Sequence, residues 1–309
     1  MSADPHAPQD AIKGLWLGAL GVVMFAMTFP MTRLAVGDAQ HPQLSPEFVT
    51  AARAALAGLL SLVYLRRVRA PFPHRSQWRS LVVCALGTVI GFPLCIALAL
   101  REVPSMHAAV VTGVIPMGTA IVGALALRQR PSWGFWACAA AGCALVLAYA
   151  AWSGGGRWVA ADGWLLLAVV STSLAYVAGG RASSQMPAQQ VICWVVAGSL
   201  PVTLPLTVGW WPAQPASWSA WGGLLYVSLF SMWLGFFAWY RGLALGGIVR
   251  VSQVQLIQPF LALLFAVPVL GERLDPVTVM FSLAVIAVVF VGRRMPVGAA
   301  HERRDGGSR

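Results

Sequence analysis

Charged side chains are scarce in this 309-residue sequence: Asp, Glu, Lys and Arg together make up only 10% of it. Soluble domains carry about 25% charged residues. A chain with so little charge and 58% hydrophobic residues cannot cover itself with a polar surface. The composition therefore excludes an ordinary soluble protein and predicts an integral membrane protein.

Several chemical motifs are also missing. There is no GxxxxGK[ST] sequence, so we expect no ATP hydrolysis within this chain. There is no GxSxG sequence, and His107 is the only histidine expected inside the bundle, which argues against an intramembrane enzyme. The five cysteines lie in apolar runs without CxxC spacing, so they predict core side chains and no metal site. We expect no cofactor and no catalytic residues.

Acidic residues are missing from the middle of every expected helix. All ten lie in the tails, in loops or at helix ends. Carriers that couple transport to protons or sodium often hold a buried carboxylate. The sequence therefore favours facilitated diffusion or exchange over carboxylate-driven proton coupling, and a polyvalent cation would fit poorly.

What the sequence does contain is a series of long apolar runs. Each has about 17–24 residues, enough to cross a hydrocarbon core at a rise of about 1.5 Å per residue. They predict an all-α membrane fold with ten transmembrane helices, at residues 14–35, 46–65, 78–100, 104–127, 132–152, 162–181, 189–209, 218–240, 247–270 and 276–292. The polar N-terminal stretch lacks the basic region of a secretory signal, so we expect the first helix to remain uncleaved.

The basic residues predict the orientation of these helices. If the N-terminus is cytoplasmic, 16 of the 21 Lys and Arg residues lie on the cytoplasmic side, and only Arg33, Arg101, Arg157 and Arg273 lie outside. Cytoplasmic loops are enriched in Lys and Arg. We therefore expect a multi-pass protein of the cell (inner) membrane with both termini in the cytoplasm. Orientation also explains the net charge of +11, so no nucleic-acid partner is expected.

An internal repeat emerges when the sequence is shifted by 143 positions, which places Pro116 on Pro259 and Arg130 on Arg273. Five helices per unit is an odd number, so the two units must be inverted, as in many secondary transporters. The predicted organisation is an N-terminal tail (1–13), a first five-helix repeat (14–152), a linker (153–161), a second repeat (162–292) and a basic tail (293–309).

Three segments carry a resemblance to a known family: "LSPEFVTAARAALAGLLSLVYL", "SMHAAVVTGVIPMGTAIVGALAL" and "VRVSQVQLIQPFLALLFAVPVLGERLDPVTVMFSLAVIAVVFVG". They resemble the drug/metabolite transporter superfamily, and within it the EamA-type ten-helix carriers. The family pattern of a mid-helix proline, an apolar run and a Gly-Glu pair is complete in the second repeat, at Gly271–Glu272. The first repeat has Arg128 and Gln129 at that place, so if Glu272 caps the next helix, the first repeat must satisfy those amides differently, and Ser132 is a candidate. The resemblance, over residues 14–292, implies the fold and a transport function.

Polar residues in two helices predict a substrate site. In helix 247–270, Gln255, Gln258 and Pro259 share one stripe, whereas Gln253 points elsewhere. In the related helix 104–127, the stripe consists of Thr112, Pro116 and Thr119. A mid-helix proline leaves a carbonyl unpaired, and such groups persist when packed in protein or lining a watery cavity. We favour a cavity over the alternative, hydrogen bonds that hold helices together.

Other helices offer walls for the same cavity. Helix 218–240 has Trp233 and Phe237 on one face and small residues on the other, where close packing is expected. Its inverted counterpart offers Thr88 and Phe92. The remaining mid-depth candidates are Thr28 and Tyr176.

We expect structural or gating roles for four charged residues, Arg53, Arg33, Arg181 and Glu272. Arg53 is the most deeply placed, and contact with a substrate carboxylate is its alternative role. His107 lies off the polar stripe, so a structural role is favoured over proton relay.

These observations predict a secondary transporter that moves small organic metabolites by alternating access through a central cavity. Amino-acid-like or other amphipathic solutes suit a neutral, aromatic cavity with Arg nearby, and efflux is the expected direction. The expected partners are the small-molecule substrate and the lipid bilayer. A non-transporting receptor or scaffold remains the main alternative, and an intramembrane enzyme is the other.

Overall fold

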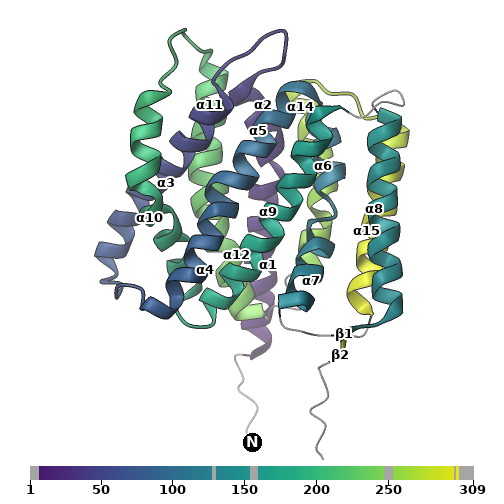
Figure 1. Ribbon diagram of the computed structural model, residues 1–309, viewed down its shortest axis with the longest axis horizontal. Helices are drawn as coiled ribbons and strands as arrows, with labels where there is room; N and C mark the ends of the chain where they lie inside the picture. Colours follow the sequence, from purple (N-terminus) through teal and green to yellow (C-terminus); the bar gives the residue numbers. More distant parts are fainter. Residues whose placement is uncertain (1–6, 127–129, 154–158, 247–252, 296, 299–309) are drawn as a thin grey trace, which may run out of the picture.

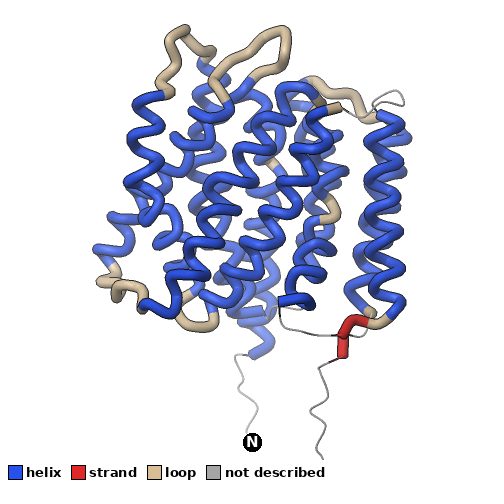
Figure 2. Tube along the Cα trace, viewed as in Figure 1, coloured by secondary structure: helices blue, strands red, loops and turns tan. Residues whose placement is uncertain are grey.

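The computed structural model describes residues 7–126, 130–153, 159–246, 253–295 and 297–298, and almost all of them are helical (Figure 1, Figure 2). The α-helices are α1 (Ala7–Ala26), α2 (Thr28–Val36), α3 (Pro46–Arg67), α4 (Arg75–Ala85), α5 (Phe92–Glu102), α6 (Ser105–Thr112), α7 (Ile115–Ala126), α8 (Trp133–Ser153), α9 (Ala160–Ser183), α10 (Ala188–Gly209), α11 (Trp218–Tyr226), α12 (Gly235–Gly246), α14 (Gln258–Leu270) and α15 (Pro276–Arg294). The other elements are the π-helices η1 (Leu86–Gly91) and η2 (Val227–Leu234), the 3₁₀-helix η3 (Gln253–Ile257) and the paired two-residue strands β1 (Arg130–Pro131) and β2 (Val297–Gly298).

The predicted all-α membrane fold is confirmed. Within the described ranges, 8 helical segments are long and apolar enough to cross a membrane. Two shorter apolar helices, Val254–Leu270 and Pro276–Gly292, occupy the places of the last two predicted spans. Several predicted spans consist of two or three consecutive elements, and these interruptions bear on the site below.

Helix ends are fixed by local chemistry. Ser45 caps α3, with its Oγ accepting from the Phe48 amide at 3.1 Å. Asp275 caps α15 in the same way, through the Thr278 amide at 2.9 Å. Capping side chains satisfy amides that have no partner within the helix. At the other end of α14, Gly271 has φ +69°, a left-handed conformation that glycine adopts without strain.

Several of the closest helix contacts join elements of the two predicted five-helix units. Helix α1 packs against α12, and α9 packs against α4, η1 and α5, which is the corresponding pairing after exchange of the two units. Three further pairings each join a helix to its own counterpart: α3 with α10, α6 with α14, and α8 with α15. A pseudo-twofold axis would produce this pattern. The predicted unit boundaries stay a prediction.

The described ends of the chain lie on one side of the bundle. In Figure 1, the start of α1 and the pair β1–β2 lie at the lower edge, whereas the loops after α2 and α10 lie at the upper edge. This arrangement fits an even number of crossings.

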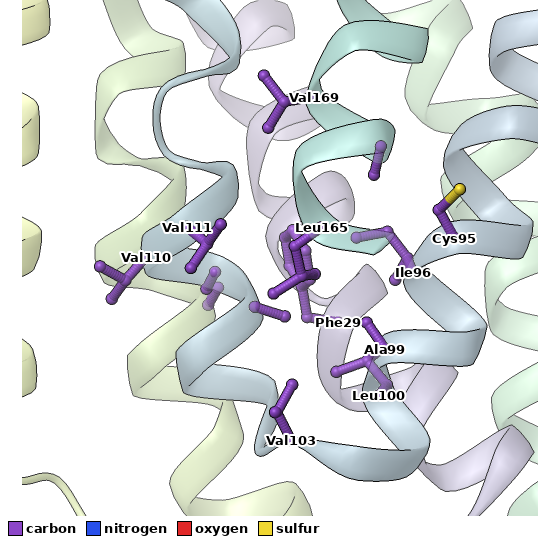
Figure 3. Packing of buried hydrophobic residues seen from close by; sticks show 14 of the residues in the cluster. Phe29, Cys95, Ile96, Ala99, Leu100, Val103, Val110, Val111, Leu165 and Val169 are labelled. Carbon is purple, nitrogen blue, oxygen red and sulfur yellow. The ribbon is translucent and has the colours of Figure 1, made fainter. Parts of the chain in front are cut away.

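Small side chains let the backbones approach closely. A Cβ atom added to Gly87 would collide with the Ser171 carbonyl and the Ala175 side chain, so α9 passes directly over η1. Elsewhere in the bundle, buried apolar side chains fill the space between helices. Figure 3 shows Phe29 and Leu165 between the helix with Leu100 and the helix with Val111.

Candidate central cavity

A cavity lies where the two predicted units meet, and about 810 Å³ of space there, part of it open to solvent, is not filled by protein atoms. Its walls come from most of the predicted spans, and its lining residues are apolar or uncharged polar except for one arginine. They are Phe25, Thr28, Phe29, Arg53, Thr88, Phe92, Ala109, Thr112, Gly113, Ile115, Pro116, Thr172, Tyr176, Ser231, Met232, Phe236, Gln255, Leu256, Gln258, Pro259 and Ile286. Sites of this kind, largely apolar with a few polar groups, are typical of small-molecule binding.

Nine of the twelve residues that the sequence proposed for substrate binding line this cavity. They are Thr28, Thr88, Phe92, Thr112, Pro116, Tyr176, Gln255, Gln258 and Pro259. Thr119, Trp233 and Phe237 are not among the lining residues. The side chain of Gln253 lies outside the described residues.

Trp233 and Phe237 face a different part of the bundle. Their ring centroids are 5.0 Å apart, and the Phe237 ring lies 4.9 Å from that of Tyr64 on α3. The prediction assumed α-helical spacing throughout this span, but η2 is a π-helix, which changes the angular position of the residues that follow it. Ser231, from the face of small residues predicted for packing, therefore lines the cavity. Met232 and Phe236 line it as well.

Thr119 lies beyond the cavity end of α7. Its hydroxyl donates to the Ile115 carbonyl at 2.9 Å, one turn back along the same helix. The two other residues of that stripe, Thr112 and Pro116, line the cavity on either side of the break between α6 and α7.

Pro116 and Pro259 are not mid-helix prolines, which corrects the sequence interpretation. Helix α6 ends at Thr112, and α7 begins at Ile115, so that Pro116 is its second residue. Likewise η3 ends at Ile257, and Pro259 is the second residue of α14. Proline is well tolerated in a first turn because the amide there has no intrahelical acceptor. Two residues separate α6 from α7 in the first span, whereas in the second span the helix changes directly from 3₁₀ to α geometry at Gln258. A new α-helical segment therefore begins at the cavity wall in both spans.

Arg53 on α3 belongs to a buried polar cluster. It is 3% exposed, and its Nη2 donates to Ser231 Oγ at 3.2 Å. Thr28 Oγ1 donates to the same Ser231 oxygen at 2.8 Å. From the sequence, Ser231 belongs to the small-residue face of helix 218–240, where close packing is expected. The sequence does not reveal the π-helix η2, which places Ser231 at the cavity.

Two polar atoms at the cavity have no hydrogen-bond partner, Arg53 Nε and Thr172 Oγ1. The residues that the sequence interpretation did not select for the site include Phe25, Phe29 and Phe236. A helical apolar pattern does not distinguish an aromatic side chain that borders a cavity from one that packs in the core.

The other three charged candidates hold helix ends in place. The Arg33 guanidinium donates to the carbonyl groups of Leu100 and Val103, and Arg181 donates to the Ala126 carbonyl at 2.9 Å. Glu272 accepts from the amides of Ser105 and Met106 at 2.7 and 3.0 Å, so it caps α6.

The residues that cap α8 and α15 test the capping role predicted for the Gly-Glu motif. Glu272 does not cap the helix that follows it, because Asp275 does so. In the first repeat, Ser132 Oγ accepts from the Phe135 amide at 3.4 Å and caps α8, as expected from the sequence. Arg128 and Gln129 lie outside the described residues.

A buried carboxylate is present after all. Asp162, in the first turn of α9, is 1% exposed, and its Oδ1 lies 2.8 Å from His107 Nε2. The second imidazole nitrogen lies 2.9 Å from Ser153 Oγ. The sequence placed Asp162 at a helix end and predicted no buried carboxylate, because the packing of α6 against α9 is not visible in the sequence. Neither residue lines the cavity.

Comparisons with known proteins agree with this architecture. The family model described as "EamA-like transporter family" matches residues 12–150 and 159–292. The chain is 44% identical, over 90% of its length and 96% of the relative's, to a protein of Bacillus subtilis (strain 168) named "Uncharacterized transporter YdeK".

A more distant relative and a solved structure extend the comparison. The chain is 24% identical, over 96% of its length and 99% of the relative's, to a "Probable terminal-alkyne amino-acid exporter" of Streptantibioticus cattleyicolor. A solved crystal structure with 16% identity covers 90% of the chain and 95% of its own, with a TM-score of 0.62, which supports the fold alone.

Proposed function

Because the chain belongs to the EamA-like transporter family, we propose that it moves small organic metabolites across the cell (inner) membrane by alternating access through the central cavity. The chain is a multi-pass membrane transporter, and its family and relatives are transporters, not enzymes. The substrate class, the direction and the cytoplasmic location of both termini are parts of the proposal.

One observation carries it: the cavity lies between discontinuous spans of both predicted units, where secondary transporters bind substrate. Gln255 and Gln258 supply amide groups, Tyr176 and Thr112 supply hydroxyl groups, and phenylalanine rings supply apolar walls. Such a lining suits an amphipathic solute with a polar head and an apolar body.

Efflux of amino-acid-like solutes is the finer part of the proposal. A relative over nearly the whole chain is named as an amino-acid exporter. The excess of basic residues on the side of the described chain ends favours cytoplasmic termini.

The test compares cells that lack the protein with cells that overexpress it. We expect at least one amphipathic metabolite to accumulate outside the overexpressing cells and inside the cells that lack the protein. The purified transporter should then be thermally stabilised by that metabolite. Stabilisation should be lost in the Gln255→Leu and Gln258→Leu variants and kept in Gln189→Leu, whose side chain does not line the cavity. Equal stabilisation of all variants would rule out this site.

A further inference from the structure

Arg53 is the one charged residue among the described residues that line the cavity. No carboxylate lines the cavity within the described ranges, and no lysine or histidine does. The cavity wall therefore carries a single positive charge, and the question is what neutralises it.

The guanidinium of Arg53 is far from satisfied by the protein. A guanidinium has five N–H donors. Arg53 uses Nη2 for the contact with Ser231, the sulfur of Met232 lies 3.9 Å from the same nitrogen, and Nε has no partner. Ser231 accepts from both Arg53 and Thr28, so its own hydroxyl hydrogen is free for a further acceptor.

Four of the described carboxylates near the membrane-spanning part have other partners. Asp38 lies beside Arg33 and His41, and Asp162 lies beside His107. Glu272 caps α6, and Asp275 caps α15. None of the ion pairs of the described residues includes Arg53. Because an unpaired buried charge is unfavourable, an anion that enters the cavity gains from this position.

Helix N-termini add positive potential at the same place. Helix α7 has 12 residues and α14 has 13, and the first turn of each lines the cavity through Pro116 and Pro259. The N-terminus of a helix carries a partial positive charge and favours anions. In transporters with discontinuous helices, such half-helix ends face the anionic group of the substrate.

We propose that Arg53 binds the carboxylate of the substrate, and that the substrate is a small organic monoanion with an apolar body. This proposal rests on the transport function proposed above and narrows its substrate class from amino-acid-like solutes to those that carry a carboxylate and no ammonium group. The carboxylate accepts from the Arg53 guanidinium and the Ser231 hydroxyl, while Phe29, Phe92 and Phe236 contact the apolar body.

The same lining selects against a positively charged group. An ammonium group in the cavity would find amide and hydroxyl oxygens but no carboxylate among the described residues. A zwitterion therefore gains less than a monoanion of the same shape, and a cation is repelled by Arg53. The order of affinity is monoanion, zwitterion, cation.

A monoanion also supplies a driving force. The potential inside a bacterial cell is negative relative to the outside. One elementary charge that crosses 100 mV changes in free energy by about 2.3 kcal/mol. This energy can maintain a concentration ratio of about 50 across the membrane. A carrier of one carboxylate without a compensating ion therefore exports its substrate down the membrane potential.

The first experiment measures binding with three probes that share the phenylalanine skeleton: N-acetyl-L-phenylalanine (an anion), L-phenylalanine (a zwitterion) and L-phenylalaninamide (a cation). We expect the anion to stabilise the purified transporter against heat at the lowest concentration. Arg53→Gln should weaken its binding at least about 10-fold, the loss expected for a charged hydrogen bond, and Arg53→Lys should restore part of it. Arg241→Gln, at an exposed position outside the cavity, should bind like the wild type.

The outcome that overturns the proposal is a binding order led by the amide or by phenylalanine, or no binding of the anion. If Arg53→Gln does not fold, Ser231→Ala provides the second variant, and it should weaken binding of the anion while leaving binding of the amide unchanged. Equal effects on both probes would contradict the contact between Ser231 and a carboxylate.

The second experiment needs no variant. Proteoliposomes loaded with N-acetyl-L-phenylalanine are given a potassium diffusion potential with valinomycin, and release is followed with and without a pH gradient. An interior-negative potential of about 100 mV should accelerate release, and the opposite potential should slow it. Release that follows the pH gradient and ignores the potential would refute transport of an uncompensated monoanion. If cells instead export a neutral or cationic metabolite, the proposed transport function stands and the monoanion proposal fails.

Discussion

The buried pair of His107 and Asp162 joins helices from both predicted units, so its removal tests how strongly they are held together. His107 lies on α6 and Asp162 on α9, and the Ser153 hydroxyl at the end of α8 lies beside the same imidazole. The imidazole ring is also 5.1 Å from the ring of Tyr149. All the contacts lie at one end of the bundle, where α6 and α9 begin.

The size of the effect follows from what each substitution leaves behind. His107→Ala leaves a buried carboxylate with only the Val159 amide, at 3.3 Å, as a partner. Loss of the partner of a buried acceptor costs about 1–3 kcal/mol, and more where the acceptor is charged. We therefore expect a loss of about 3 kcal/mol for His107→Ala. Asp162→Ala leaves an imidazole that still has Ser153 as a partner, so we expect a loss of about 1–3 kcal/mol.

The assay is a double-mutant cycle on unfolding in mixed micelles. Because each single variant already removes the contact between the two side chains, the double variant should lose less than the sum, by about 1–3 kcal/mol. A matched control exists in the second His–Asp pair, His41 and Asp38, whose side chains are 84% and 33% exposed. Its coupling energy should be about 0–1 kcal/mol. Additive losses at His107 and Asp162, within about 0.5 kcal/mol, would refute the reasoning.

Three further predictions concern the scaffold. Gly87→Leu should prevent α9 from packing on η1 and abolish monodisperse expression, whereas Gly180→Leu, with no atom within 4 Å of an added Cβ, should express like the wild type; size-exclusion chromatography decides. Glu272→Ala should lower the unfolding free energy by about 1–3 kcal/mol, because it removes a charged cap from α6, and Glu272→Gln should recover part of that loss in the same micelle assay. The hydrogen bond from the Thr278 amide lowers the pKa of Asp275, so its stabilising effect is present above the ordinary carboxyl pKa and is lost as the pH falls through the lowered value. The difference in thermal stability between the wild type and Asp275→Ala should therefore disappear in acid, and a constant difference would contradict this.

Hydrophobic run length and charge placement were enough to predict the membrane fold. An apolar run of about 20 residues has few alternatives to a spanning helix, so α3, α9 and α10 begin and end within a few residues of the predicted positions. Polar residues in apolar surroundings were nearly as informative, because Gln255, Thr112 and Thr28 are unfavourable in lipid and reach the cavity.

The errors within the spans that line the cavity share one physical cause. Sequence periodicity was read with an α-helical repeat, and the spans that line the cavity depart from it. In η2 the departure places Ser231 at the cavity and Trp233 away from it. Asp162 was misjudged for another reason, since burial of a helix end depends on which neighbours cover it.

These irregularities recur at related positions of the two units. Shifting η1 by the repeat spacing places Leu86–Gly91 within η2, and the breaks before Pro116 and Pro259 coincide in the same way. A π-helix or a broken helix weakens backbone hydrogen bonding and is retained in a membrane only where protein or a cavity compensates. Their repetition in both units indicates that the cavity, and not one unit's packing, requires them. Helices α7 and α14 also begin at the cavity wall, so the two predicted units would each contribute one partial positive charge to it. Together with the unpaired guanidinium of Arg53, they make the site electropositive in the absence of substrate, and this connects the repeat architecture to the charge of the solute.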